Sequence, residues 1–575
     1  MPRQFSGKVH VSRVRILRKS GITYVYERTT QYDQKKKKTV TTATRLLGKI
    51  LAGSSEMIPT RPRKRSGDAG GNVFATRTHV GLTDILEWAG RSSLIDKDVR
   101  ASFCPGDAEK ILSIARYWLG TDGNTLPRLE GWQIMHELPY PYGISEDVYG
   151  DLFKSLGCNE DGIQRYFQAR AARLNKKAVI AYDSTTISTY SVNQKEARRG
   201  FNKEHDGLDT IKLLTLYSVK DREPIAFAKQ PGNIPDVIAI NSAIEQLKCF
   251  DVEKPLVTTD TGYYSADNIR DMCRRNMKFL TLIDTDVTMA REAVDTLRDE
   301  LESMSAICPF DYYVSGSSIS VMHTFKWRRK RQRGEKKAGD DEEMQRRLYF
   351  HVFKSNDLVN KHEVNFRQRL LELKRQVEEG VTEFTDAAQK RIDKYLALSR
   401  QGRGGKLHVT FREEECAKAR RYFGYFVLVS NSPMEVFEAL VNYRLREKIE
   451  ELFQDVKESV DGRRPRIWYS DSLRGRQFVQ FVALCYRCYI TKKIKAVEEQ
   501  LCSDEEHKTK EQLKLEKSLK NWLRQRSLAQ IFDWFDCVEA TSVKTDTGMR
   551  RWSSETVAKD RLFLKMLGVT DSCSN

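Results

Sequence analysis

Apolar and polar positions change their period several times along this chain, and each change marks a change in predicted structure. Residues 8–50 alternate in the manner of strands around a charged turn, and residues 80–175 repeat apolar positions with the spacing of amphipathic helices. From residue 178 onward, short apolar runs end in polar residues, which is typical of buried strands. The runs AVIAYD, KLLTLYSV, PIAFAKQ and PLVTTD predict such strands, and the amphipathic stretch PDVIAINSAIEQLKCF predicts a helix before the last of them.

The order of these elements predicts the fold class. Two or three antiparallel strands, a crossover helix and a further strand form the opening of a ribonuclease-H-like α/β fold. The order is lost between about 286 and 420, where residues 319–327 and 348–355 predict a strand pair and residues 362–398 a long charged helix. The run YFGYFVLVS then predicts another buried strand, and NSPMEVFEALVNYRLREKIEELFQDVK predicts one continuous helix.

The balance of charge narrows the kind of partner. The chain has 98 Lys and Arg against 79 Asp and Glu, a net charge of +19. A folded protein with this surplus usually binds a polyanion, and nucleic acid is the first candidate, although a basic enzyme without such a partner is an alternative. Basic runs at 35–38, 61–65 and 328–333 could follow DNA phosphates or could be solvated loops.

The apolar runs, the N-terminal residues and the cysteines bear on the cellular compartment. No apolar run is long enough to span a membrane, and the N-terminal residues lack the apolar region of a secretory signal. Eleven cysteines without regular spacing argue against a disulfide framework, and Cys485 and Cys488 are expected on an apolar helix rather than in a zinc site. These features favour a reduced, cytoplasmic protein that makes no use of a membrane.

Two aspartates lie at the ends of predicted buried strands, Asp183 at the end of AVIAYD and Asp260 at the end of PLVTTD. Open α/β sheets place their sites at the carboxyl ends of strands, so neighbouring strands would bring these carboxylates together. Converging carboxylates repel each other unless a cation lies between them, and Mg²⁺ prefers such oxygen ligands. The alternative is that both residues simply face water.

The predicted helix after residue 432 could supply a third acid. Tyr443, Arg446, Glu450 and Lys457 have offsets of 0, 3, 7 and 14, which places them within a 60° stripe of a regular helix at about 100° per residue. Such a face could bind a metal through Glu450 and phosphates through the bases. Helical periodicity does not distinguish Glu450 from the neighbouring Glu447 and Glu451, and a solvated face of salt bridges is the alternative.

The segments YDSTT, PGNIPD, TTDTGYYSADNI and YFGYFVLVSN, together with the spacing Tyr443-x2-Arg446-x3-Glu450-x6-Lys457, resemble the IS-four family of bacterial insertion-sequence transposases. The resemblance covers residues 178–285 and 420–490. It implies a catalytic Asp-Asp-Glu triad at Asp183, Asp260 and Glu450 that binds two Mg²⁺ ions, with Mn²⁺ as a substitute.

The changes of pattern along the chain divide it into parts, and the resemblance implies that the middle part is an insertion. We expect an α/β ribonuclease-H-like catalytic core interrupted by an α+β insertion domain, with an N-terminal strand region and helical domain and a helical C-terminal region. The expected parts are an N-terminal β-rich region (1–60), a helical DNA-binding domain (78–175), the first part of the core (176–285), the insertion domain (286–420), the second part of the core (421–500) and a helical C-terminal region for oligomerisation (501–575).

The activity implied by the resemblance is cutting of double-stranded DNA at the ends of a mobile element, strand release through a hairpin in some members, and joining to target DNA. A homodimer would act in a synaptic complex, in a bacterium or archaeon, associated with the nucleoid. Tyr443, Arg446 and Lys457 would hold phosphates. Trp327 is a candidate for stacking on a flipped base, although its place on one strand face with Ile319, Val321 and Phe325 favours a core residue.

Two further arginines, Arg463 and Arg464, lie in the basic segment RRPRIWYSDSLRGRQ that follows the proposed catalytic helix. We expect both to contact DNA. Two other functions remain open from the residues alone. One is a ribonuclease-H-like nuclease or resolvase without strand transfer, and the other is a domesticated DNA-binding protein without catalysis.

Overall fold

The computed structural model of the chain describes residues 5–18, 22–33, 38–54, 56–59, 74–174, 178–200, 202, 206–235, 238, 255–328, 339–400, 407–462, 464–503, 508–545, 548–554 and 556–569. Several sequence predictions lie outside these residues. They are most of the basic runs at 35–38, 61–65 and 328–333, the helix predicted at 235–250, and Arg463. No helix among the described residues is long and apolar enough to cross a membrane.

The N-terminal part of the chain is the predicted set of strands. An antiparallel four-stranded sheet comprises β1 (Phe5–Leu17), β2 (Thr23–Asp33), β3 (Lys38–Ile50) and β4 (Ile58–Pro59). The predicted helices follow as α1 (Gly81–Ser92), α2 (Ile95–Ser102), α3 (Pro105–Gly120), η1 (Leu126–Arg128), α4 (Leu129–Trp132), α5 (Glu146–Gly157) and α6 (Glu160–Ala171). Their apolar faces are buried with few exceptions, in accord with the helical spacing of those residues.

A nine-stranded mixed sheet forms the centre of the molecule. Its strands are β6 (Val179–Thr189), β7 (Asp209–Ser218), β8 (Glu223–Pro231), β9 (Leu256–Thr259), β10 (Lys278–Ile283), β11 (Ile307–Cys308), β12 (Asp311–Arg328), β13 (Asp341–Ser355) and β16 (Tyr425–Ser430). Their order is β11-β12-β13-β16-β10-β9-β6-β7-β8. β6, β7 and β8 are antiparallel, and β9 and β10 run parallel to β6, as the sequence of elements predicted.

The strands expected in an insertion domain extend this same sheet. β16 pairs with β10 on one side and with β13 on the other, and β12 continues beyond β13. The predicted strand pair at 319–327 and 348–355 is therefore present, but it shares a sheet with the residues expected in the core. Between β9 and β10 the chain forms η2 (Thr261–Tyr263) and α8 (Ala266–Arg274). Between β10 and β11 it forms α9 (Thr288–Leu301) and η3 (Met304–Ala306).

The helix predicted over 362–398 is interrupted. The structure has α10 (Asn356–Glu378) and α11 (Asp386–Tyr395), and Gly380 lies between them with a φ of 89°. This left-handed conformation, which glycine adopts without a Cβ penalty, ends α10. The chain continues through the two-stranded sheet of β14 (Leu396–Arg400) and β15 (Leu407–Phe411) to α12 (Glu413–Arg420).

The helix predicted after residue 432 is also two helices, α13 (Val436–Arg444) and α14 (Glu447–Glu458). At the junction the amides of Arg446 and Ile449 bond the carbonyls three residues before them, Tyr443 and Arg446. Such tighter i to i+3 bonds replace the α-helical pattern at a helix end. The segment contains neither Gly nor Pro, so nothing local to the sequence signals the interruption.

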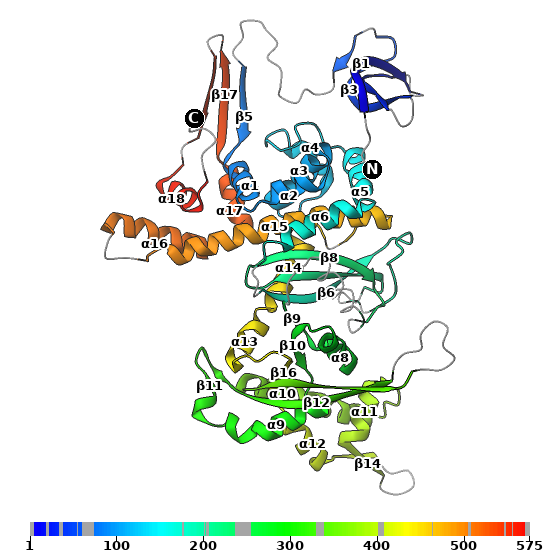
Figure 1. Cartoon of the computed structure of the whole chain (residues 1–575), viewed down its shortest axis with the longest axis vertical. Helices are drawn as coiled ribbons and strands as arrows, with labels where there is room; N and C mark the ends of the chain where they lie inside the picture. Colours follow the sequence, from blue (N-terminus) through cyan, green and yellow to red (C-terminus); the bar gives the residue numbers. More distant parts are fainter. Residues whose placement is uncertain are drawn as a thin grey trace.

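The long helix α15 (Ser470–Gln500) crosses the molecule between the helices α1–α6 and the strands β6–β8 (Figure 1). It packs on α5, α3 and β8, which explains why its middle section is apolar on all sides. Cys485 and Cys488 lie on this helix as free thiols, as expected. The rings of Phe478 and Phe481 of α15 make edge-to-face contacts with the ring of Tyr166 of α6, so these contacts connect the two helices.

The C-terminal region differs from the prediction, because it is only partly helical. After α16 (Lys510–Arg524) and α17 (Leu528–Asp536) the chain forms a hairpin of β17 (Glu539–Thr545) and β18 (Gly548–Ser553), and α18 (Ala558–Leu567) follows. β17 also pairs with β5 (Phe74–His79), so the three-stranded sheet joins distant parts of the chain (Figure 1).

Candidate active site

Asp183 and Asp260 lie at equivalent positions on neighbouring parallel strands. β6 and β9 pair Val179 with Leu256 and Ala181 with Thr258, and each aspartate comes two residues after the second of these pairs. Asp260 directly follows β9, as predicted, and its Oδ1 accepts the amide of Thr261 at 2.8 Å. The prediction that Asp183 ends its strand is wrong, because β7 continues to pair with β6 as far as Thr189.

The α13–α14 junction brings a third acid to these two. The Arg446 guanidinium lies 3.2 Å from Asp183 Oδ2, 3.7 Å from Asp260 Oδ2 and 3.4 Å from Glu450 Oε1. Tyr443, the penultimate residue of α13, donates its hydroxyl to Asp260 Oδ1 at 3.2 Å. One arginine therefore contacts the carboxylates of two strands and one helix that are far apart in sequence.

Exposure increases from the arginine outward. The side chains of Arg446 and Asp183 are 8% and 16% exposed, whereas Asp260 and Glu450 are 41% and 63% exposed. Burial by itself would lower the pKa of the Arg446 guanidinium, but the acidic groups around it together raise that pKa above its ordinary value. Burial and the nearby Asp260 carboxylate raise the pKa of the Tyr443 hydroxyl. The site is thus a charged cluster that opens to solvent on its Glu450 side.

The geometry separates the three acids that helical periodicity left equal. Glu450 contacts Arg446, whereas Glu451 pairs with Lys448 on its own helix, and Glu447 is exposed. The predicted 60° stripe does not exist as such, since Tyr443 belongs to α13 and Glu450 to α14. The three side chains nevertheless meet. The interruption between the helices lets Tyr443 contact Asp260, and it lets Arg446 contact both aspartates and Glu450.

The other predicted site residues lie apart from this cluster in different ways. Lys457 is half-buried two turns further along α14. Trp327, near the end of β12, is half-buried with the guanidinium groups of Arg270 and Arg274 of α8 at 5.1 and 5.3 Å from its ring. Arg464 pairs with Asp206 at 2.7 Å and lies over the ring of Tyr190.

The three carboxylates have the chemistry of a divalent-metal site. Carboxylate oxygens are hard ligands of the kind that Mg²⁺ and Mn²⁺ bind, and the cluster already concentrates negative charge around one cation, the Arg446 guanidinium. A metal ion bound by all three carboxylates would occupy the position that the Arg446 guanidinium holds between them, so Arg446 would have to give way.

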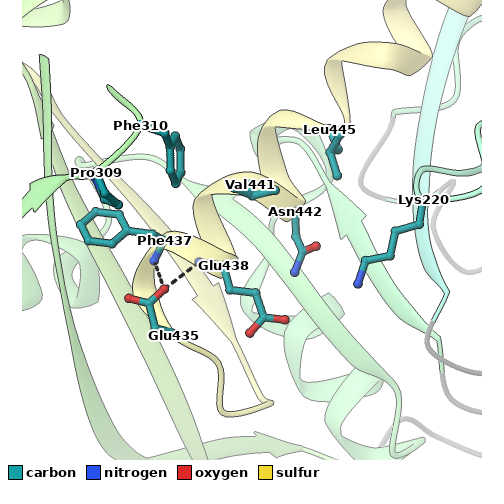
Figure 2. Close-up of a pocket in the computed structure, with 9 residues that line it drawn as sticks. All are labelled: Lys220, Pro309, Phe310, Glu435, Phe437, Glu438, Val441, Asn442 and Leu445. Carbon is teal, nitrogen blue, oxygen red and sulfur yellow. Dashed lines mark hydrogen bonds between the residues drawn. The ribbon is translucent and has the colours of Figure 1, made fainter. Parts of the chain in front are cut away.

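A separate pocket of about 570 Å³ lies on another face of α13. It is lined by Lys220, Pro309, Phe310, Glu435, Phe437, Glu438, Val441, Asn442 and Leu445. Figure 2 shows Phe310 and Lys220 facing this helix from opposite sides, with the Glu435 carboxylate bonded to the first backbone amides of α13. None of the three clustered carboxylates lines the pocket, so α13 serves the cluster and the pocket with different residues.

The sequence predicted the members of the cluster but not that Arg446 lies at its centre. Arg446 was expected to face DNA, yet it is buried and forms the contact shared by all three acids. No local pattern marks that role, because its partners lie on β6, after β9 and on α14. The interruption between α13 and α14 escaped prediction for the same reason.

Residues 174–486, more than half of the chain, match the family model for the transposase DDE domain. This segment contains the two aspartates, Tyr443, Arg446 and Glu450. No curated protein matches the chain. A solved structure that resembles it is the cryo-electron-microscopy structure of the piggyBac transposase synaptic complex with hairpin DNA. It shares 10% sequence identity at a TM-score of 0.33, over 79% of this chain and 82% of that one.

A structural likeness at this level assigns neither residues nor activity. The family match rests on the sequence itself and spans the central sheet from before β6 into α15. Enzymes of this family generally use divalent metal ions, in accord with the three clustered carboxylates. The chain therefore belongs to the transposase DDE domain family and is a DDE transposase, an enzyme of DNA transposition.

Proposed function

We propose that the chain is an insertion-sequence transposase of the IS-four type that cuts the ends of its element and joins them to target DNA. The observation that carries the proposal is the contact of Arg446 with Asp183, Asp260 and Glu450. The Tyr-Arg-Glu-Lys spacing supports the IS-four assignment, and we propose a cut-and-paste reaction with strand release through a hairpin. The protein would act in the cytoplasm of a bacterium or archaeon.

We propose that Asp183, Asp260 and Glu450 hold two Mg²⁺ ions, which Mn²⁺ could replace. When bound, these ions would activate a water or a 3′-hydroxyl and stabilise the departing oxygen of an in-line displacement. Two neighbouring strands hold the aspartates at a constant separation, and Glu450 approaches them from α14. The hydroxyl of Tyr443 holds one oxygen of Asp260 and thereby orients the other.

Arg446 would exchange partners when DNA binds. Its guanidinium neutralises the carboxylates, and on our proposal it turns to a backbone phosphate, for which its fork of donors is suited. The carboxylates it leaves are then available for metal. Tyr443 and Lys457 would complete the contacts with phosphates near the cut.

We expect further DNA contacts away from the three carboxylates, in accord with the excess of positive charge. We propose that Trp327 stacks on an unpaired base after the guanidinium groups of Arg270 and Arg274 leave its ring and bind DNA phosphates. Arg463 and Arg464 would bind the backbone of double-stranded DNA at the element ends or target. We also propose that residues 78–175 contribute to DNA binding and that residues 501–575 contribute to a homodimer in the synaptic complex.

The experiment that tests the proposal incubates the full chain with a duplex carrying its own element's end in the presence of Mg²⁺. Asp183→Asn, Asp260→Asn and Glu450→Gln keep the side-chain shape but remove a metal ligand. We expect each to lower the rate of terminal cleavage on the order of a thousandfold or more. Gel analysis of 5′-labelled strands measures cleavage, and integration into a plasmid measures joining.

Glu447→Gln and Glu451→Gln are matched controls, because both acids lie on the same helix as Glu450. We expect both to cleave at nearly the rate of the unaltered chain. Loss of cleavage in Glu447→Gln with full activity in Glu450→Gln would contradict the residue assignment. Cleavage without any joining would instead favour a nuclease.

A further inference from the structure

A second cluster of ligand-type side chains lies outside the segment that matches the DDE domain. His79 ends β5, His136 follows α4, and Asp536 ends α17. One ligand atom from each residue lies within 4.8 Å of the other two. Among the described residues, no other group of three histidine, cysteine or acidic side chains meets this condition.

The hydrogen bonds determine which ring nitrogens are available. His79 Nδ1 lies 2.6 Å from the backbone carbonyl oxygen of Asp536 and 3.4 Å from its Oδ2. A carbonyl oxygen only accepts, so His79 Nδ1 carries a proton, and in the neutral ring Nε2 has the lone pair. His136 Nδ1 likewise donates to the carbonyl of Trp132 at 2.8 Å. Both rings therefore use one nitrogen to anchor themselves to the backbone.

The remaining contact of His136 needs a cation. Its Nε2 lies 2.7 Å from Asp536 Oδ1, although a neutral ring with Nδ1 protonated has only a lone pair to offer there. A lone pair and a carboxylate oxygen at this distance repel each other unless positive charge lies between them. Either a proton or a metal ion could supply that charge. The second histidine, 4.8 Å away between ring centroids, favours the metal, because a proton would use only one of the two rings.

We propose that His79, His136 and Asp536 bind a structural Zn²⁺ ion. Imidazole nitrogens and a carboxylate oxygen are among its usual ligands, and donation of the other ring nitrogen to a backbone carbonyl is typical of ligating histidines. Ligands around tetrahedral zinc lie about 3.3 Å apart, so the Asp536 oxygen must withdraw from His136 Nε2, now 2.7 Å away. The His79 ring must also turn to present Nε2, because Nδ1 is the nitrogen that lies 3.4 Å from Asp536 Oδ2. His136 is buried and stacked on Trp132 at 3.7 Å, which holds its ring in place.

The ion would join three segments that are distant in sequence. His79 and Asp536 are 457 residues apart, and His136 and Asp536 are 400 apart. The site lies at the base of the sheet of β5, β17 and β18, where β5 enters the helical part of the molecule (Figure 1). Closing such long loops restricts the unfolded chain, so zinc would stabilise the connection between the N-terminal helices and the C-terminal region.

The test measures zinc directly rather than DNA cleavage, so its outcome is separate from that of the proposed function. The full chain carries Asp183→Asn, which limits divalent-ion binding at the other carboxylates. After dialysis, Zn²⁺ is titrated in competition with a chromophoric chelator. We expect one tight equivalent, and we expect His136→Gln and Asp536→Asn each to weaken its binding at least about tenfold.

His408→Gln is the matched control, because His408 is exposed on β15 within a different sheet. It should bind zinc as tightly as the unaltered chain. Equal zinc binding by the His136→Gln variant and the unaltered chain would overturn the proposal. A melting temperature that is lower in His136→Gln, but that zinc changes in neither protein, would also overturn it and would indicate a protonated His136.

Cobalt provides a readout that does not depend on whether the variants fold. Co²⁺ added to the unaltered metal-free chain should produce the visible absorption of a tetrahedral nitrogen and oxygen site, and added Zn²⁺ should abolish it. Absence of this absorption, together with absence of retained zinc, would also overturn the proposal.

Discussion

The Arg446 side chain illustrates how a single residue can hold a repulsive group together. Three carboxylates within 4 Å of one guanidinium would repel one another strongly without it, since the arginine is 8% exposed and its surroundings screen charge poorly. The raised pKa of Arg446 is the consequence of this neighbourhood. A cation is therefore needed among these acids, either the Arg446 guanidinium or a bound metal ion.

Arg446→Gln should accordingly lower the stability of the fold and make it depend on divalent metal. Only Asp183 of the three acids is largely shielded from solvent, and leaving its carboxylate without a partner costs about 1–3 kcal/mol. We expect Mg²⁺ to restore part of this loss by replacing the missing charge. Urea unfolding with and without Mg²⁺ measures both effects.

Arg444→Gln is the control for this substitution. Arg444 precedes Arg446 by two residues and pairs with Asp311 at 2.6 Å, with both side chains partly exposed. Its loss should cost less than about 1 kcal/mol and should not respond to Mg²⁺. An equal loss in both variants, or no influence of Mg²⁺ on Arg446→Gln, would show that Arg446 is not the counter-ion of the three acids.

At the scale of elements, the packing of α15 on α5 depends on two glycines. A Cβ on Gly475 of α15 would overlap the backbone carbonyl of Phe153, and one on Gly157 of α5 would overlap the backbone of Asp471. Each helix thus uses a glycine where the backbone of the other comes closest. The alignment of α15 over the central sheet follows from this close approach.

Gly475→Ala should therefore destabilise the protein by about 2 kcal/mol, because one methyl group forces the two helices apart. Gly150→Ala is the matched control, since Gly150 is an exposed glycine within α5 and a Cβ there meets no atom within 4 Å. Alanine has the better helix propensity, so the control should gain about 0.5–1 kcal/mol. Chemical denaturation of both variants measures the two opposite signs. A neutral Gly475→Ala would contradict the close packing.

The elements also show where sequence patterns are sufficient. The runs AVIAYD and PLVTTD predicted β6 and β9, because a strand buried on both faces must be apolar throughout. The junction of α13 and α14 was missed, because both helices have good helical composition and the interruption serves contacts with distant strands. The hairpin of β17 and β18 was missed because both strands are short and the side chains of β18 are largely exposed, so they carry little pattern.

At the scale of the whole molecule, parts far apart in sequence share sheets. The strands predicted for an insertion extend the central sheet, and β5 from the N-terminal half pairs with β17 from the C-terminal end. β17 is the middle strand of its sheet, with β5 on one side and β18 on the other. Its stability therefore governs the connection between both ends of the described chain.

Val543→Pro should loosen this connection. Val543 lies in β17 opposite Ala75 and Arg550, and proline removes a backbone donor and disturbs the pairing of a central strand. We expect hydrogen exchange in residues 74–79 to accelerate at least roughly tenfold, while exchange in β6 stays unchanged. Val543→Thr, which retains the branched side chain, should exchange like the unaltered chain. Unchanged protection of β5 in the proline variant would contradict the sheet assignment.

The sequence by itself determined the class of the protein. Buried strands with terminal acids, amphipathic helices and the Tyr-Arg-Glu-Lys spacing are local patterns, and the family match agrees with the class they predicted. Only the tertiary structure decided that Arg446 lies among the three acids, that Glu450 rather than Glu451 faces it, and that two histidines meet Asp536. Most of those contacts join residues far apart in the sequence, and periodicity along one chain carries no information about which distant side chains will meet.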